Sequence, residues 1–287
     1  MHIGLNPTKG NVPMIHFSSV YTPTQMRHGA VFSARQYPRQ AFDNLIDPVL
    51  NVDWFEMSGP TFPPHPHAGF SAVTYLFADS PNGFINRDSM GEVQDIRPGG
   101  LHWSRASRGM MHEEVPIPDA GPVQGLQIFI NLPADSQADP AAAFPVPATI
   151  VESRSGPGWE SRIAVDGTTL GEAVQALPSP VRIEEISLDG SAAHDIDVPA
   201  GWGGILIVLE GSVAIGAMTL ARAQAIGFVA DVDDRMRITA RSGPARLAVI
   251  GGAQLKQPVF AYGPLMLASP ASLDEARRRV ASLTIPA

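Results

Sequence analysis

Short apolar runs, rich in β-branched and aromatic residues, recur along the whole chain and end near Gly, Pro, Asn or Asp. The clearest are residues 73–77, 126–132, 205–209, 213–215 and 246–250. Runs of this length with such boundaries are typical of β-strands. The 287 residues include 27 Gly and 27 Pro, which supply the turns that many short strands need. The pattern therefore predicts an all-β protein.

Residues 132–147 interrupt this pattern with a segment rich in Pro, Ala and Asp. We interpret the segment as a linker with one short helical turn, dividing the chain into domains of residues 1–140 and 141–287. Each half has many short strands at turn-bounded spacing, which predicts a sandwich or barrel in each domain.

Two local signals in the second half predict further elements. Residues 209–213 join two apolar runs and have a Gly at the centre, which predicts a hairpin with Gly at the turn. Ser272 and Glu275 have the spacing of a capping box at the start of a good helix sequence. We expect one C-terminal helix over residues 275–283.

The composition narrows the classes of function. The chain has no Cys, which excludes disulfides, thiolate zinc sites, iron–sulfur clusters and a cysteine nucleophile. Lys and Arg total 20 against 28 Asp and Glu, and the net charge of −8 argues against direct nucleic-acid binding. Residues 1–7 lack the features of a secretory signal, and the longest apolar run, 204–209, is too short to span a bilayer. We expect a cytoplasmic protein without membrane contact.

Four of the eight histidines, His65, His67, His102 and His112, fall within one stretch of the first half. Alternate side chains of a strand share a face, so His65 pairs with His67 and His112 with Glu114. If the two strands lie side by side, three imidazole nitrogens and one carboxylate converge. This donor set suits Fe, Mn, Ni, Co, Cu or Zn, and an octahedral ion would keep two positions for water, dioxygen or a chelating substrate. The spacing predicts a catalytic metal site.

The remaining candidates have simpler interpretations. Glu113 should face away from Glu114 and be solvated. For His102, an ordinary strand histidine and a role beside the metal pocket both stay open. Histidines without a partner at ligand spacing are His2, His16, His28 and His194. Because the second half has a single histidine, we expect its barrel to be free of metal.

Longer motifs surround these residues. Gly59 precedes His65 with the spacing of the first cupin motif, and the distinctive segments are residues 65–70, 86–91, 98–103, 108–114, 125–132 and 258–266. Together they resemble the pirin family of the cupin superfamily. This resemblance implies a bicupin, two antiparallel β-barrels packed face to face, with a metal in the first. The family's ligands fall on His65, His67, His112 and Glu114.

The resemblance also implies chemistry. Pirins are associated with iron, so iron comes first among the metals, with Ni, Zn, Mn, Co and Cu as alternatives. Bacterial members resemble quercetin 2,3-dioxygenases, and animal members act as nuclear co-regulators of transcription. The chain departs from the family at Ser71, usually Glu, at Gly100, usually Asp, and at His102, commonly Gln. That Glu is a ligand in many other cupins, so its absence favours Glu114 as the carboxylate donor.

Three functions follow from these observations. The first is a metal-dependent dioxygenase of flavonol-like or other enediol substrates, with O₂ and substrate at the metal and Glu114 as catalytic base. The second is a non-enzymatic, redox-sensing regulatory protein that binds a protein partner. A third is a cupin isomerase or hydrolase of a small polar metabolite. Oxygen consumption separates the first from the others.

Overall fold

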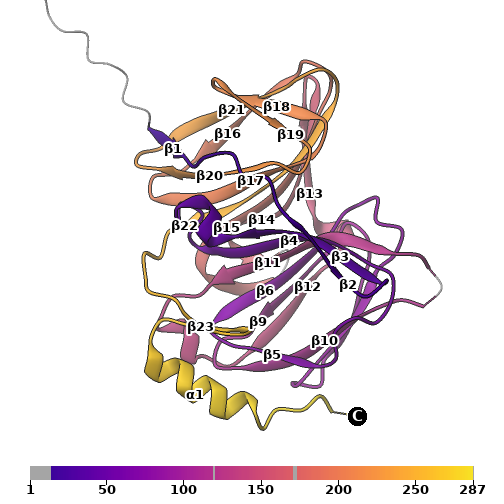
Figure 1. Ribbon diagram of the computed structural model, residues 1–287, viewed down its shortest axis with the longest axis vertical. Helices are drawn as coiled ribbons and strands as arrows, with labels where there is room; N and C mark the ends of the chain where they lie inside the picture. The colour runs from indigo at the N-terminus through magenta and orange to yellow at the C-terminus, as the bar shows by residue number, and fades with distance from the viewer. Residues whose placement is uncertain (1–13, 119, 171–172, 287) are drawn as a thin grey trace, which may run out of the picture.

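The computed structural model describes residues 14–118, 120–170 and 173–286. Residues 1–7, on which the expectation about a secretory signal rests, lie outside the described residues, as does His2. The described chain forms two stacked β-barrels, with one helix at the far end of the first barrel (Figure 1).

The first barrel is a seven-stranded sheet that faces a four-stranded sheet. In spatial order the larger sheet contains β12 (Ala142–Val146), β9 (Leu101–Arg105), β6 (Phe70–Leu76), β11 (Val123–Asn131), β4 (Val49–Met57), β3 (Phe32–Pro38) and β2 (Gln25–His28). The smaller sheet contains β5 (His65–His67), β10 (Met110–Pro116), β7 (Phe84–Asp88) and β8 (Val93–Ile96). Neighbouring strands pair antiparallel in both sheets.

The second barrel repeats this plan strand for strand. Its larger sheet contains β1 (Ile15–Phe17), β20 (Ala225–Ala230), β17 (Trp202–Glu210), β22 (Ala245–Ala253), β15 (Ala173–Leu188), β14 (Trp159–Leu170) and β13 (Glu152–Gly156). Its smaller sheet contains β16 (Ala193–Val198), β21 (Asp234–Ala240), β18 (Ser212–Ile215) and β19 (Met218–Ala221). The two strand orders match position by position, so β16 and β21 correspond to β5 and β10. The predicted all-β, two-barrel architecture is confirmed.

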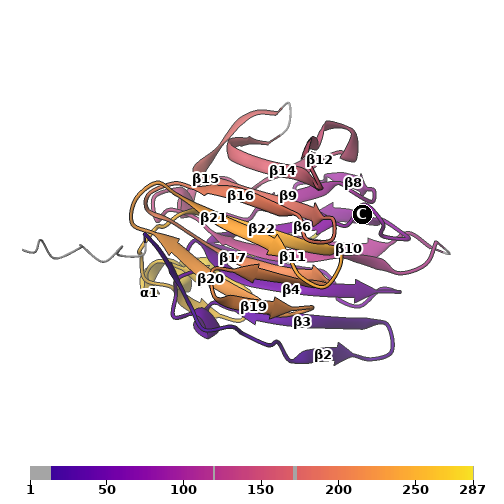
Figure 2. The ribbon, with the colours of Figure 1, turned by 90° about the horizontal axis from the view of Figure 1, so that it is seen from above.

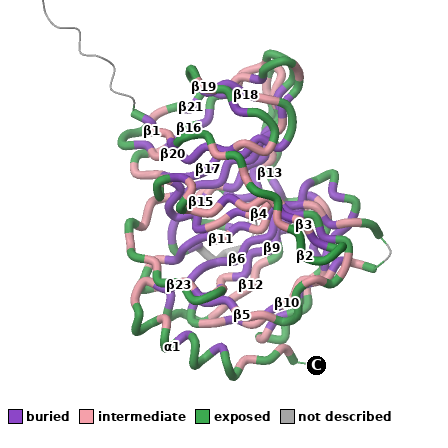
Figure 3. The backbone as a smooth tube through the Cα atoms, viewed as in Figure 1, coloured by how far each residue is buried: buried purple, intermediate pink, exposed green. Residues whose placement is uncertain are grey.

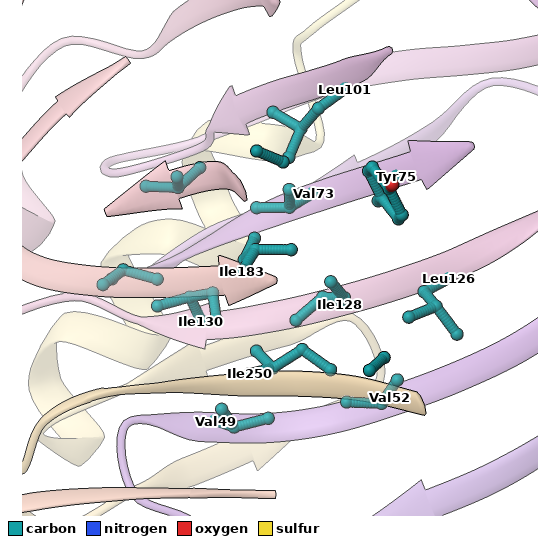
Figure 4. Close-up of a cluster of buried hydrophobic side chains, with 14 of the residues drawn as sticks. Val49, Val52, Val73, Tyr75, Leu101, Leu126, Ile128, Ile130, Ile183 and Ile250 are labelled. Atoms are coloured by element: carbon teal, nitrogen blue, oxygen red, sulfur yellow. The ribbon is translucent and has the colours of Figure 1, made fainter. Parts of the chain in front are cut away.

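The two larger sheets pack against each other and share one hydrophobic core. Val73 and Ile128 of the first barrel meet Ile183 and Ile250 of the second in this core (Figure 4). Buried residues fill the layer between the barrels (Figure 3), and strands of both sheets run along nearly the same line (Figure 2), as in aligned sheet packing. Because strand side chains alternate, the other face of each large sheet lines its own barrel.

Two segments pair across the expected domain division. Strand β1, near the start of the described chain, pairs with β20 of the second barrel. Strand β12, from the segment interpreted as a linker, pairs with β9 of the first. That segment also contains the expected helical turn, η2 (Ser136–Ala138); the other 3₁₀ turns are η1 (Arg39–Phe42) and η3 (Ala148–Ile150). The division at residue 140 stays a prediction.

The hairpin predicted over residues 209–213 is wrong. Strand β17 pairs with β20 and β22, whereas β18, which follows it, pairs with β19 and β21. Gly211 is therefore a corner where the chain passes from the large sheet to the small one. Its φ is 69°, and a Cβ there would lie 2.2 Å from the Pro244 carbonyl oxygen. The positive φ and the close carbonyl oxygen both explain why this position requires glycine.

The C-terminal helix α1 (Pro270–Val280) begins earlier than predicted. Ser269, not Ser272, is the N-cap, because the Ser269 hydroxyl accepts a hydrogen bond of 3.1 Å from the Ser272 N–H. Pro270 then occupies the first turn, where its missing N–H costs nothing. None of the helices in the described ranges reaches the length and hydrophobicity needed to cross a membrane.

A short hairpin before the helix covers the edge of the first barrel. It consists of β23 (Phe260–Tyr262) and β24 (Leu265–Leu267). The Met266 N–H donates a 3.0 Å hydrogen bond to the Ala68 carbonyl, next to His67. A Cβ at Gly69 would lie 2.0 Å from the Met266 carbonyl oxygen, so glycine permits this close approach. The end of the chain thus supports the strand that carries two of the predicted metal ligands.

Candidate metal centre

Three predicted ligands meet inside the first barrel. Strands β5 and β10 are antiparallel neighbours, and His65 lies directly opposite His112. Each pair among the His65, His67 and His112 rings has a centroid separation of 4.8 Å. One ring nitrogen of each residue lies within 4.8 Å of the others, an arrangement that could hold one metal ion. The alternation rule and the strand pairing together produce this triangle.

Hydrogen bonds orient two of the three rings. The His65 Nδ1 lies 3.0 Å from the Pro63 carbonyl oxygen, and the His112 Nδ1 lies 3.1 Å from Asn86 Oδ1. The Pro63 carbonyl can only accept, so the proton of His65 belongs on Nδ1, and Asn86 with its amide oxygen toward the ring requires the same of His112; each Nε2 lone pair is then free for a metal. The donor chemistry therefore fits a bound metal ion.

Burial keeps these imidazoles neutral, which is the form that metals bind. It lowers the pKa of His67 to about 3, with a further decrease from the neighbouring His65. Burial also lowers the pKa of His65, and it lowers that of His112 well below its usual value. The cluster is thus a preformed set of neutral nitrogen donors near neutral pH.

Glu114 lies on the same face of β10 as His112, but its carboxylate is not part of the three-histidine cluster. Its Oε1 accepts a 2.7 Å hydrogen bond from the Thr74 hydroxyl, on the opposite sheet. Burial raises the pKa of Glu114 to about 7, while the bond from Thr74 acts in the other direction. Whether Glu114 is the fourth ligand stays a prediction.

Thr74 also lies within hydrogen-bonding distance of a second residue. Its hydroxyl oxygen is 2.8 Å from the side-chain oxygen assigned to Gln127. A threonine hydroxyl has one proton and cannot donate to two acceptors. When Glu114 is ionised and accepts from Thr74, the Gln127 amide can donate to the Thr74 oxygen only by turning its NH₂ group toward it, which gives up the 3.4 Å bond from Gln127 Nε2 to the Val73 carbonyl. Gln127 then supports the threonine that holds Glu114.

The cluster opens into a cavity of about 240 Å³ with mainly apolar walls. Its apolar lining consists of Met26, Phe32, Phe55, Met57, Phe62, Phe84, Phe129 and Pro264. The polar lining consists of Asp53, His65, His67, His112, Glu114 and Gln127. An aromatic cavity with a few convergent polar groups is typical of a small-molecule site.

The other sequence candidates neither join the histidine cluster nor line this cavity. Glu113 points away from Glu114 and forms a 2.6 Å ion pair with Arg87. His102 is buried on β9 directly opposite Thr74, and burial lowers its pKa to about 3. Ser71 is buried out of phase with Thr74 on β6, so it faces the other barrel.

The second barrel carries apolar residues at the corresponding positions. Ile196 lies opposite Met236, as His65 lies opposite His112. The residues equivalent to His65, His67, His112 and Glu114 are Ile196, Val198, Met236 and Ile238, all buried in its core. This register supports the prediction of a second barrel without metal.

Comparison with known proteins decides the family. Residues 15–130 match the family model for pirin, and residues 183–280 match the model for the pirin C-terminal cupin domain. The chain belongs to the pirin family. A pirin-like protein from tomato, Solanum lycopersicum, is 28% identical over 269 residues, which cover 92% of this chain and 90% of the relative.

Solved structures show the same fold. A quercetin 2,3-dioxygenase from Acinetobacter baumannii superposes with a TM-score of 0.80 at 23% identity, covering 93% of this pirin and 96% of that chain. A bacterial pirin from Escherichia coli, solved in complex with nickel(II), gives a TM-score of 0.62 at 14% identity and covers 84% and 99%. At these identities the likeness establishes the bicupin fold alone.

Sequence reasoning missed the polar residues that the larger sheet contributes. Thr74, Gln127 and Asp53 come from three different strands of that sheet. One signal was available, because Asp53 is an acidic residue within the largely apolar strand β4. Its partners could not be found by spacing, since their pairing depends on the strand order of the folded sheet.

Proposed function

We propose that this pirin is a metal-dependent dioxygenase of flavonol-like substrates. The observation that carries the proposal is the convergence of three neutral imidazoles at the end of an aromatic-lined cavity. Such a cavity accepts a flat ring system, while the histidines would hold the ion to which a hydroxyl–ketone chelates. The quercetin 2,3-dioxygenase from Acinetobacter baumannii, which has the same fold, supports the same substrate class.

We assign His65, His67 and His112 as ligands of one divalent transition metal, with Glu114 as fourth ligand and catalytic base. The family favours iron, and the nickel of the Escherichia coli pirin makes nickel the main alternative. A bound metal would supply a Lewis acid that acidifies the chelating hydroxyl and a place for O₂. Because Thr74 occupies Oε1, Oε2 is the oxygen of Glu114 that would bind the metal, and it would take the hydroxyl proton after leaving the metal.

The test combines metal analysis with oxygen uptake. Protein purified without a chelating tag should contain about one metal ion per chain, and it should consume O₂ when quercetin is added. Stripping the metal with a chelator should abolish the uptake, and one added metal should restore it better than the others. Oxygen consumption by the stripped protein would falsify the proposal.

One observation favours a regulatory role as a second candidate. The hairpin of β23 and β24 places Pro264 in the wall of the metal cavity and exposes Tyr262 to solvent at 57%. A protein partner that contacts Tyr262 would thus sense the metal site from outside. Metal-dependent capture of a defined partner, without oxygen uptake on any flavonol, would support this role over the enzyme.

A further inference from the structure

A row of polar side chains crosses the interior face of the larger sheet in the first barrel. Five strands contribute one directly paired residue each: His102, Thr74, Gln127, Asp53 and Gln36. Thr74 and Gln127 already have a role, because Thr74 holds the Glu114 carboxylate and Gln127 supports Thr74. Asp53 lies in the same row and lines the cavity, but it has no role in holding the metal cluster.

The second barrel shows what a barrel of this kind needs in order to fold. Its corresponding row is Ile226, Leu206, Val249, Glu184 and Ile163. Four of the five positions are apolar there, so a polar row is not a requirement of the architecture. The acidic position is kept as Glu184, whose carboxylate accepts a hydrogen bond from the Ser161 hydroxyl.

Asp53 differs from Glu184 in what it faces. The Asn51 amide donates a 3.0 Å hydrogen bond to Asp53 Oδ1, which fixes the carboxylate from the side. Toward the cavity, Asp53 faces walls made mainly of aromatic and other apolar groups. Burial raises its pKa even though Asn51 and Gln36 act to lower it. A carboxylate can accept about four hydrogen bonds, so Asp53 retains capacity for a donor inside the cavity.

We propose that Asp53 is a ligand-binding residue, whose carboxylate accepts a hydrogen bond from a hydroxyl of an aromatic ligand chelated at the histidine cluster. The histidines lie on the smaller sheet and Asp53 on the larger sheet, so the two contacts hold the ligand from opposite walls. The ligand class is therefore an aromatic compound with chelating oxygens at one end and a separate hydroxyl group. This inference rests on the proposed function in taking an aromatic chelator as ligand.

The experiment compares two flavonols that share the chelating hydroxyl–ketone. Quercetin carries further ring hydroxyls, and 3-hydroxyflavone carries none. Full-length protein is loaded with Zn²⁺, which is redox-inert, so that binding is measured by calorimetry without turnover. A hydrogen bond to a charged group changes affinity by roughly ten- to a hundredfold. We expect the wild type to bind quercetin at least about tenfold more tightly than 3-hydroxyflavone.

Two variants and one matched control isolate Asp53. Asp53→Leu should weaken the binding of quercetin about tenfold or more. The binding of 3-hydroxyflavone should stay the same or become tighter, because the cavity wall becomes apolar. Asp53→Asn, which keeps the shape, should lose part of the preference. Glu184→Gln changes the equivalent position of the second barrel and should alter neither affinity. Zinc stoichiometry should stay at the wild-type value in all of them.

The results separate this inference from the proposed function. Four outcomes would each overturn the role of Asp53. The first two are that Asp53→Leu and Asp53→Asn weaken the binding of both flavonols equally, or that they lose zinc. The other two are that the variants keep the wild-type preference for quercetin, or that the wild type binds neither flavonol. If the preference behaves as expected but iron- or nickel-loaded protein consumes no oxygen with quercetin, the dioxygenase proposal fails and the role of Asp53 stands.

Discussion

The Thr74 hydroxyl on one sheet of the first barrel lies 2.7 Å from Glu114 Oε1 on the facing sheet. The bond crosses the barrel interior and ties the carboxylate to β6, a strand that carries no predicted metal ligand. Gln127 supports the same hydroxyl at 2.8 Å. The orientation of Glu114 is therefore set by the larger sheet, whereas the three histidines are set by the smaller one.

Removing the Thr74 hydroxyl should loosen Glu114. Thr74→Val keeps the side-chain volume but removes the proton that Glu114 accepts, so we expect metal affinity to fall roughly tenfold or more. The pKa of Glu114 should rise above its value of about 7, because the hydrogen bond from Thr74 acts to lower it. Competition with a chromophoric chelator measures the affinity. Thr74→Ser keeps a hydroxyl at this position and should keep the wild-type metal affinity. Equal weakening of metal binding in both variants would contradict the hydrogen-bond explanation.

The histidine cluster should account for all tightly bound metal. His112→Ala removes one of three converging nitrogens and should reduce metal content to well below half of the wild type. Metal loading should also raise the thermal unfolding midpoint of the wild type, because an ion that binds only the folded state stabilises it. His194→Ala is the matched control, since His194 packs against Trp159 in the second barrel with a centroid distance of 4.1 Å. Equal metal loss in both variants would place the ion elsewhere.

The parts of the site that the sequence predicted depend on local periodicity. His65 and His67 share a face because a strand alternates, and the same holds for His112 and Glu114. The three histidines could be identified for this reason, and the structure brings them together. Thr74, Gln127 and Asp53 are separated along the chain and become neighbours only through strand pairing, which no local pattern specifies.

The errors in the predicted elements also arise because long-range strand pairing cannot be read from local sequence patterns. A glycine between two apolar runs serves equally well in a hairpin and in a corner between sheets, and Gly211 is a corner because long-range pairing draws β17 and β18 into different sheets. At the C-terminus, Ser269 and Ser272 are both acceptable caps. Pro270 favours the earlier start, because proline is well suited to the first turn of a helix.

His102 should make the protein sensitive to acid. Burial lowers its pKa to about 3 in the folded state, against about 6.5 when unfolded. The unfolded state therefore binds more protons below pH 6.5, and stability falls as the pH drops from there toward 3. Between pH 7 and pH 5 this one group accounts for about 2 kcal/mol. Urea unfolding measures how much unfolding free energy each protein loses between pH 7 and pH 5. His102→Gln should lose less than the wild type by about that amount. An identical loss in both proteins would mean that His102 does not titrate as described.

The buried ion pair between the barrels should contribute strongly to stability. Arg246 Nε donates a 2.6 Å hydrogen bond to Glu185 Oε1, and the Tyr75 hydroxyl from the first barrel donates a 2.8 Å bond to the other carboxylate oxygen. Arg246 also binds Asp79 of the first barrel at 2.9 Å. Arg246→Met leaves Glu185 buried with one partner fewer, which should cost about 3–5 kcal/mol of unfolding free energy.

Two further variants show whether the unpaired charge causes this loss. Adding Glu185→Gln to Arg246→Met removes the charge but keeps an acceptor for Tyr75, so the double variant should be more stable than Arg246→Met alone. Arg237→Ala breaks an ion pair with Asp195 at 2.9 Å whose side chains are 67% and 40% exposed, and it should cost less than about 1 kcal/mol. If the double variant were no more stable than the single one, lost packing of Arg246 on Phe77, rather than the buried charge, would explain the cost.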